Sequence, residues 1–152
     1  MQRVARCLAD ARAEARLQEF KQGTPTAGEA AEAVGCELDQ IVKSLVFVCD
    51  DRPVLVLVPG SYRADPAKVA EAVEAASARI ATPVQVKRIT GFEVGGVAPF
   101  PTLQGEVLIE RTLLSWTLVW VGAGTDRHMA GLAPTELLRL TKARALDVCA
   151  EH

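Results

Sequence analysis

Lys43 stands in an apolar stretch whose alternation predicts a β-strand. Period-two spacing over residues 41–49 places Lys43 on the same face as Leu45 and Phe47. Such a charge has two explanations. Lys43 lies at the frayed start of the strand and its ammonium reaches water, or the ammonium lies at the rim of a pocket, where it binds an anion or polarises a carbonyl. The pattern leaves both open.

Two glycine-rich segments could supply pocket walls. In the first, Gly95 and Gly96 let the backbone approach a ligand closely, and Pro99 stiffens the exit. Its free amides could bind an oxyanion, although a tight connection has the same composition. The second segment lacks the third glycine and the helix start of a dinucleotide fingerprint. It instead offers a set of small, polar and basic residues: Gly122, Gly124, Thr125, Asp126, Arg127 and His128.

Other catalytic arrangements have less support. His128 could be a general base, but a single histidine with no fixed partner is more often structural or exposed. No serine lies in a Gly-x-Ser-x-Gly elbow, which argues against a serine-hydrolase triad. The four cysteines are widely separated and form neither a C-x-x-C pair nor a cluster with histidine. We therefore expect no metal and no cofactor.

The elements that position these residues follow from periodicity and capping signals. An amphipathic helix is predicted at about residues 3–20. Thr26 and Glu29 have the spacing of a capping box that opens a second helix. Runs at 41–49 and 54–58 predict a β-hairpin, and the second run is apolar throughout, so helices must cover both of its faces.

The rest of the chain continues the mixture of strands and helices. Asp65 and Pro66 open a helix as N-cap and first residue, and Pro134 opens the last one. We predict short strands at residues 83–88, 106–110, 116–121 and 145–148. Because hairpins alternate irregularly with helices, the order predicts an α+β fold, a mixed, twisted β-sheet surrounded by helices, in a single domain over residues 1–152.

Composition limits the partners. The chain has 152 residues and a formal net charge of -2, which disfavours an extended electrostatic footprint on nucleic acid. Only 5% of the residues are aromatic, which disfavours rows of stacked bases. The N-terminus is too charged for a signal sequence, and no run approaches 18 apolar residues, so we expect a cytoplasmic protein with no membrane contact.

Three separated segments together resemble one family. They are residues 41–47, Gly91 and Phe92 with residues 95–99, and residues 119–125. The ordered set resembles the YbaK/EbsC family, free-standing relatives of the editing domain inserted in bacterial prolyl-tRNA synthetases. The similarity extends from about Thr24 to Val148.

This resemblance implies hydrolysis of the ester that joins a wrong amino acid to the 3' end of a tRNA. The lysine shared by the family maps to Lys43, and its Gly-x-x-x-Pro element maps to Gly95 through Pro99, with Gly96 as neighbour. By resemblance, Lys43 orients the terminal adenosine or the ester, and the loop amides hold the carbonyl. Since the family shares no established general base, a positioned water assisted by the substrate's own hydroxyl is expected.

We therefore predict a trans-editing deacylase for a small amino acid of the Ala, Ser or Thr class. The predicted partner is the aminoacylated tRNA end, with Lys43, Arg127 and a cluster at residues 139–144 as candidate contacts. Docking on a synthetase and homodimer formation stay open. One alternative is a non-catalytic module that binds aminoacyl-adenosine or an amino acid beside a synthetase. Another is a generic hydrolase that uses His128.

Overall fold

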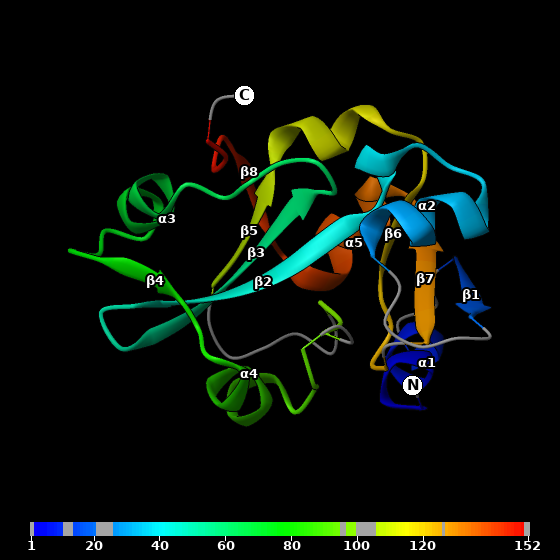
Figure 1. Cartoon of the computed structure of the whole chain (residues 1–152), viewed down its shortest axis with the longest axis horizontal. Coiled ribbons are helices and arrows are strands. Elements are labelled where there is room, and N and C mark those ends of the chain that lie inside the picture. The colour runs from blue at the N-terminus through cyan, green and yellow to red at the C-terminus, as the bar shows by residue number, and fades with distance from the viewer. Residues whose placement is uncertain are drawn as a thin grey trace.

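The protein is an α+β domain with two β-sheets, seen in a computed structural model that describes residues 2–10, 14–20, 26–94, 97–99, 106–125 and 127–150. A five-stranded mixed sheet has the order β4-β2-β3-β5-β8, and a three-stranded antiparallel sheet has the order β1-β7-β6. The sheets lie side by side, and β2 reaches from the first toward β6 of the second (Figure 1). A parallel bridge between Ile41 and Trp120 joins them.

The central hairpin of the larger sheet confirms the prediction. Strands β2 (Val42–Cys49) and β3 (Arg52–Pro59) pair antiparallel, and β3 also pairs in parallel with β5 (Glu106–Glu110). Asp50 and Asp51 make the turn with φ values of 48° and 69°, the left-handed region that tight two-residue hairpins require. Every residue from 54 to 58 is at most 2% exposed.

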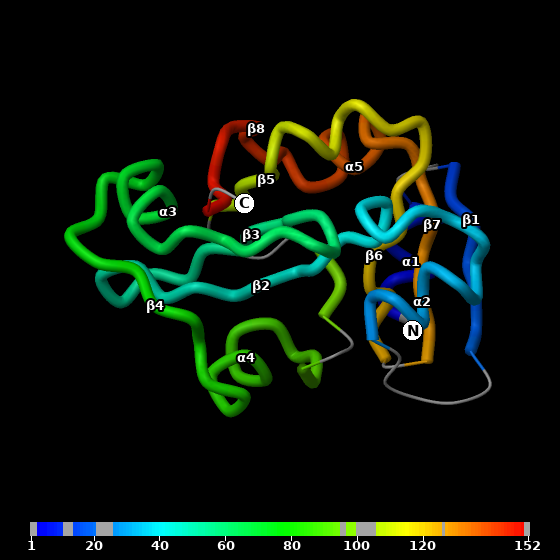
Figure 2. Tube along the Cα trace, turned by 45° about the horizontal axis from the view of Figure 1, so that its top comes forward, coloured from blue at the N-terminus to red at the C-terminus, as the bar shows by residue number. Residues whose placement is uncertain are grey.

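Helices cover both faces of this sheet, as the apolar β3 requires (Figure 2). Helix α3 (Pro66–Ala72) packs Val69 into the apolar cluster on one face, and α4 (Pro83–Thr90) packs Val86 into the cluster on the other. Helix α2 (Ala27–Val34) begins with the predicted capping box and ends at Gly35, whose φ is 74°. Helix α5 (Pro134–Thr141) begins at the predicted proline.

The first predicted helix is only half right. Helix α1 (Gln2–Asp10) buries Val4 and Leu8, but Ala15–Glu19 forms strand β1. This strand pairs residue by residue with β7 (His128–Leu132), from Ala15 opposite Leu132 to Glu19 opposite His128. Pairing with β7 satisfies the backbone hydrogen bonds of residues 15–19, which a helix would have satisfied internally. This tertiary pairing overrides the weak local preference for helix.

The strand predicted at residues 83–88 is wrong, because this segment is helix α4. The Thr82 hydroxyl accepts a hydrogen bond from the Gln85 amide at 3.2 Å, and the Thr82 amide donates to Gln85 Oε1 at 3.0 Å. Pro83 occupies the first helical turn, and Gly91 ends the helix with φ 77°. The sequence contains these cap residues, but the alternation of valines at 84 and 86 favoured a strand.

The C-terminal strands keep their order with shifted bounds. Residues 111–115 form a 3-10 helix, η2, so the strand predicted at 116–121 becomes β6 (Val119–Gly122). The strand predicted at 145–148 is β8 (Arg144–Leu146), and β4 (Ala78–Ile80) borders the opposite edge. Among the described residues, no helix has the length and apolar character needed to cross a membrane.

Candidate functional site

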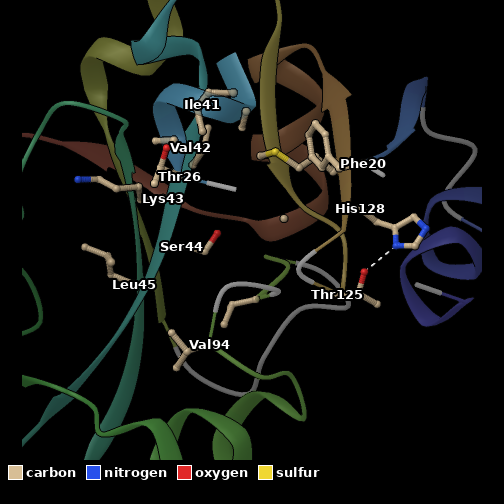
Figure 3. A pocket seen from close by; sticks show the side chains of 15 residues that line it. Phe20, Thr26, Ile41, Val42, Lys43, Ser44, Leu45, Val94, Thr125 and His128 are labelled. Carbon is tan, nitrogen blue, oxygen red and sulfur yellow. Dashed lines mark hydrogen bonds between the residues drawn. The ribbon is translucent and has the colours of Figure 1, made fainter. Parts of the chain in front are cut away.

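A pocket of about 240 Å³ opens where the two sheets meet (Figure 3). Its walls come from the start of β2, the first turn of α2, the β6–β7 turn and the segment after α4. The lining is mostly apolar, with few polar side chains among these residues: Phe20, Thr26, Ala27, Ala30, Ile41, Val42, Lys43, Ser44, Leu45, Val94, Val97, Gly122, Thr125, His128 and Met129. An apolar cavity with a few convergent polar groups is typical of a small-molecule site.

Lys43 lines this pocket but sends its ammonium outward. As the second residue of β2 it pairs with Val58, so the strand is not frayed at this position. Its side chain lies on the side of the strand away from Thr125 and His128 (Figure 3), where the ammonium donates a hydrogen bond to the Tyr62 carbonyl. Burial lowers the pKa of Lys43 below its ordinary value, because desolvation disfavours the charged form.

Ser44 is a polar pocket residue that the sequence analysis missed. Strand alternation turns its side chain to the side of β2 opposite Lys43, toward the β6–β7 turn (Figure 3). The Ser44 hydroxyl oxygen is buried and has no hydrogen-bond partner among the residues that the structure describes. Its position next to Lys43 in an alternating strand was the available signal, and the hydroxyl can hydrogen-bond a ligand from the pocket wall.

His128 has two partners, in contrast to the isolated histidine that the sequence suggested. Its Nδ1 lies 2.6 Å from the Thr125 hydroxyl, and its Nε2 lies 2.9 Å from the Glu19 carboxylate. A neutral imidazole that carries its proton on Nε2 satisfies both contacts, donating to Glu19 and accepting from Thr125. In that arrangement His128 has no lone pair left for a substrate, so it orients Thr125 within the pocket wall.

The structure brings together only part of the predicted site. Gly122, Thr125 and His128 line the pocket with Lys43. Gly124 makes the β6–β7 turn with φ 101°, and Pro99 is buried close in sequence to the lining residue Val97. The predictions for three residues lie outside the described part of the chain: Gly95, Gly96 and Asp126.

Several of the basic residues predicted to contact tRNA already have partners within the chain. Arg127 donates through Nε to the Phe20 carbonyl at 3.4 Å. Arg139 pairs with Glu136 at 2.6 Å and Arg144 with Glu106 at 2.8 Å. Neither of these ion-paired arginines lines the pocket.

The described residues offer no cluster of metal ligands, and the buried Cys149 thiol is unreactive. Among these residues, no group of three His, Cys, Asp or Glu side chains could hold a metal ion. Cys149 is buried, and burial together with the nearby Glu110 carboxylate raises the pKa of its thiol to about 12. This thiol therefore stays protonated near neutral pH and is a poor nucleophile.

Comparison with known proteins decides the family. The family model of the aminoacyl-tRNA editing domain matches residues 21–140. The chain belongs to the aminoacyl-tRNA editing domain family. The match includes α2, Lys43, Ser44 and the β6–β7 turn, so every described lining residue of the pocket except Phe20 lies within the matched region.

Individual relatives agree with this assignment. The protein YwhH of Bacillus subtilis is 31% identical over 136 residues, which cover 88% of this chain and 86% of YwhH. A proline-tRNA ligase of Lactiplantibacillus plantarum is 30% identical over 107 residues, 70% of this chain but only 19% of the ligase. The editing domain thus corresponds to about a fifth of that ligase.

A solved structure matches nearly the whole fold. A crystal structure described as a candidate trans-editing enzyme for prolyl-tRNA synthetase has a TM-score of 0.90 and 38% sequence identity. The alignment covers 99% of this chain and 96% of that one. The mixed α+β architecture of the editing domain is therefore shared over its full length, including β1 and the N-terminal helix.

Proposed function

We propose that this editing domain is a trans-acting aminoacyl-tRNA deacylase, which hydrolyses the ester between a small amino acid and the 3' end of a tRNA. The observation that carries the proposal is the mostly apolar pocket of about 240 Å³ beside Lys43 and Ser44, within the region matched by the editing-domain family. Its volume is below the range of about 300–1,000 Å³ usual for drug-sized ligands. That size favours a small aminoacyl group.

The proposed reaction needs stabilisation of charge more than a strong base. Water adds to the ester carbonyl carbon, the bond to the ribose oxygen breaks, and the ribose hydroxyl and the free amino acid leave. Backbone amides of Gly95 and Gly96 are the proposed donors to the oxyanion, and such a donor contributes about 10²- to 10³-fold in rate. We assign Lys43 to orientation of the adenosine or the ester and Pro99 to shaping of the loop.

The proposed substrate class is Ala, Ser or Thr. A synthetase pocket discriminates one methylene by only about 1–3 kcal/mol, so small near-cognate amino acids need removal by a second site. Ser44 and Thr125 contribute hydroxyl-bearing side chains to the mostly apolar pocket lining and support a small or hydroxylated side chain. Gly122, Gly124 and Asp126 are the further proposed contacts. The proposed setting is cytoplasmic, on the aminoacylated tRNA end, with a synthetase as a further partner.

The test is a panel of tRNAs mischarged with Ala, Ser, Thr and larger amino acids, incubated with wild type, Lys43→Ala and His128→Ala. We expect wild type to release at least one small amino acid faster than buffer does, and Lys43→Ala to lose about 10²-fold or more. His128→Ala should retain part of the activity because both of its ring nitrogens have partners. No release above buffer, or loss in His128→Ala alone, contradicts the proposal.

A second candidate is a non-catalytic module that binds aminoacyl-adenosine. One observation favours it. Among the described lining residues, no side chain directs a free basic atom into the pocket, since both His128 nitrogens are engaged. Calorimetry with 3'-alanylamino-3'-deoxyadenosine, an amide that resists hydrolysis, separates the two. Tight binding of the amide with no turnover of the matching ester supports the binding module.

A further inference from the structure

We propose that Asp39 is a positioning residue for Lys43, and that it acts through the turn that contains Ser61 and Tyr62. The inference rests on the proposed function in one respect, because it takes Lys43 to act on the substrate. Asp39 lies outside the pocket lining and next to the turn that follows β3.

Two sets of hydrogen bonds, joined by the backbone link between Ser61 and Tyr62, connect the two residues. The Asp39 carboxylate oxygen Oδ1 accepts from the Ser61 amide at 2.9 Å and from the Ser61 hydroxyl at 2.6 Å. The next residue, Tyr62, presents the carbonyl that accepts the Lys43 ammonium, while its amide donates to Pro59 at 3.0 Å. Asp39 therefore holds the turn whose carbonyl holds Lys43.

The base of this chain is itself held on two sides. Asp39 belongs to a 3-10 helix, η1 (Leu38–Gln40), and Gln40 donates through Nε2 to the Leu118 carbonyl at 2.9 Å. On the other side, a Cβ added to Gly60 would lie 2.5 Å from the Leu38 carbonyl oxygen. This separation leaves no room for a side chain, so the turn lies directly against η1.

The negative charge of Asp39 also favours the hydrogen bond between the Lys43 ammonium and the Tyr62 carbonyl. Burial, and to a smaller extent Arg63, lowers the pKa of Lys43, whereas the Asp39 carboxylate raises it. Asp39 thus favours the ammonium form that donates to Tyr62 and that would contact the substrate. Loss of Asp39 should therefore change the protonation and the reactivity of Lys43 as well as its position.

The experiment compares Asp39→Ala with a matched control, Asp50→Ala, at the other end of β2. Asp50 makes the same kind of clamp, accepting from the Ala76 amide at 2.7 Å and the Ser77 amide at 3.1 Å. Two quantities are measured: kcat and KM on the mischarged tRNA that wild type cleaves best, and the rate of Lys43 acetylation by acetic anhydride, followed by mass spectrometry.

We expect Asp39→Ala to lower kcat about 10- to 100-fold, since misplacement of a reacting group by about 1 Å can cost about 10²-fold. Lys43 should be acetylated several-fold faster, while Asp50→Ala changes neither quantity by more than about twofold. Asp39→Asn, which keeps an acceptor for Ser61 but removes the charge, should recover part of kcat.

Equal kcat and equal Lys43 acetylation in Asp39→Ala and Asp50→Ala overturn the inference. If Asp39→Ala does not fold, Ser61→Ala, which removes only the hydroxyl bond, replaces it with the same two readouts. If wild type cleaves no ester, the proposed function fails, but the acetylation rates of Lys43 in the same variants still support or overturn the positioning role of Asp39.

Discussion

The buried Ser44 hydroxyl lowers the stability of the folded protein, because no neighbouring group that the structure describes hydrogen-bonds to it. An unmade hydrogen bond of this kind costs about 1–3 kcal/mol. Ser44 belongs to the pocket lining, and a bound ligand toward which the hydroxyl rotates would supply the missing partner. A penalty in the free protein that a ligand removes is typical of binding sites, which give up stability for function.

Replacement of Ser44 by alanine should therefore separate stability from activity. We expect Ser44→Ala to raise the free energy of unfolding by up to about 1 kcal/mol, because the unsatisfied hydroxyl is removed. The same variant should raise KM for the mischarged tRNA several-fold. Urea unfolding and steady-state deacylation measure the two effects. A variant that is destabilised and fully active would refute a ligand role for Ser44.

At the scale of elements, two capping boxes of the same design lie in different settings. Thr26 opens α2 and lines the pocket, whereas Thr82 opens α4 and does not. Each hydroxyl accepts from the amide three residues later, at 3.1 Å from Glu29 and 3.2 Å from Gln85. The local chemistry is matched, so any difference between their variants reports the contribution of α2 to the pocket.

We expect Thr26→Ala and Thr82→Ala each to lose about 1 kcal/mol of stability, the usual cost of an N-cap hydroxyl. Thr26→Ala should also raise KM, because the first turn of α2 forms part of the pocket wall. Thermal unfolding and deacylation of both variants check this. Equal KM values would show that the α2 cap has no role in substrate binding.

Across the whole molecule, acid stability should depend on clamped carboxylates. The Lys68 ammonium, 2.9 Å away, lowers the pKa of Asp147, and the Ala76 amide lowers that of Asp50, both from an ordinary 3.8. A carboxyl with a depressed pKa in the folded state adds stability above its unfolded pKa, and this is lost as pH falls through the folded value.

The asparagine variants Asp147→Asn and Asp50→Asn should accordingly melt at lower temperature than wild type at pH 7. Their deficit should shrink as the pH falls below 3.8, through the lowered pKa values at which the wild-type carboxylates also become protonated. Thermal unfolding followed by circular dichroism measures this difference in melting temperature. The pH series runs from pH 2 to pH 7, because that range includes the ordinary pKa of aspartate. A deficit that does not change with pH would show that charge plays no part.

The net charge of the chain limits how many tRNA phosphates it can contact. With a net charge of -2 and Arg139 and Arg144 paired internally, contact should involve few phosphates. The logarithm of kcat/KM should fall against the logarithm of salt concentration with a slope of about 2, as expected for about 2–3 neutralised phosphates. A slope above about 5 would indicate an extended basic footprint and contradict this expectation.

The sequence alone determined features that depend on neighbouring residues or on burial on both faces of a strand. The α2 capping box, the Asp65 cap, the hairpin at residues 41–58 and the two-sided covering of β3 are of this kind. Where a cap precedes no competing alternation of apolar residues, as at Thr26, or where turn residues bound an apolar run, composition and spacing suffice to predict the element.

Only the tertiary structure decided contacts between segments far apart in the chain. Strand β1 exists because β7 pairs with it, and His128 acquires Glu19 as a partner through the same ladder. The carbonyl of Tyr62 captures Lys43 because the turn after β3 returns to the start of β2. Partners of this kind are separated by many residues, and nothing in local spacing encodes which backbone group will meet a given side chain.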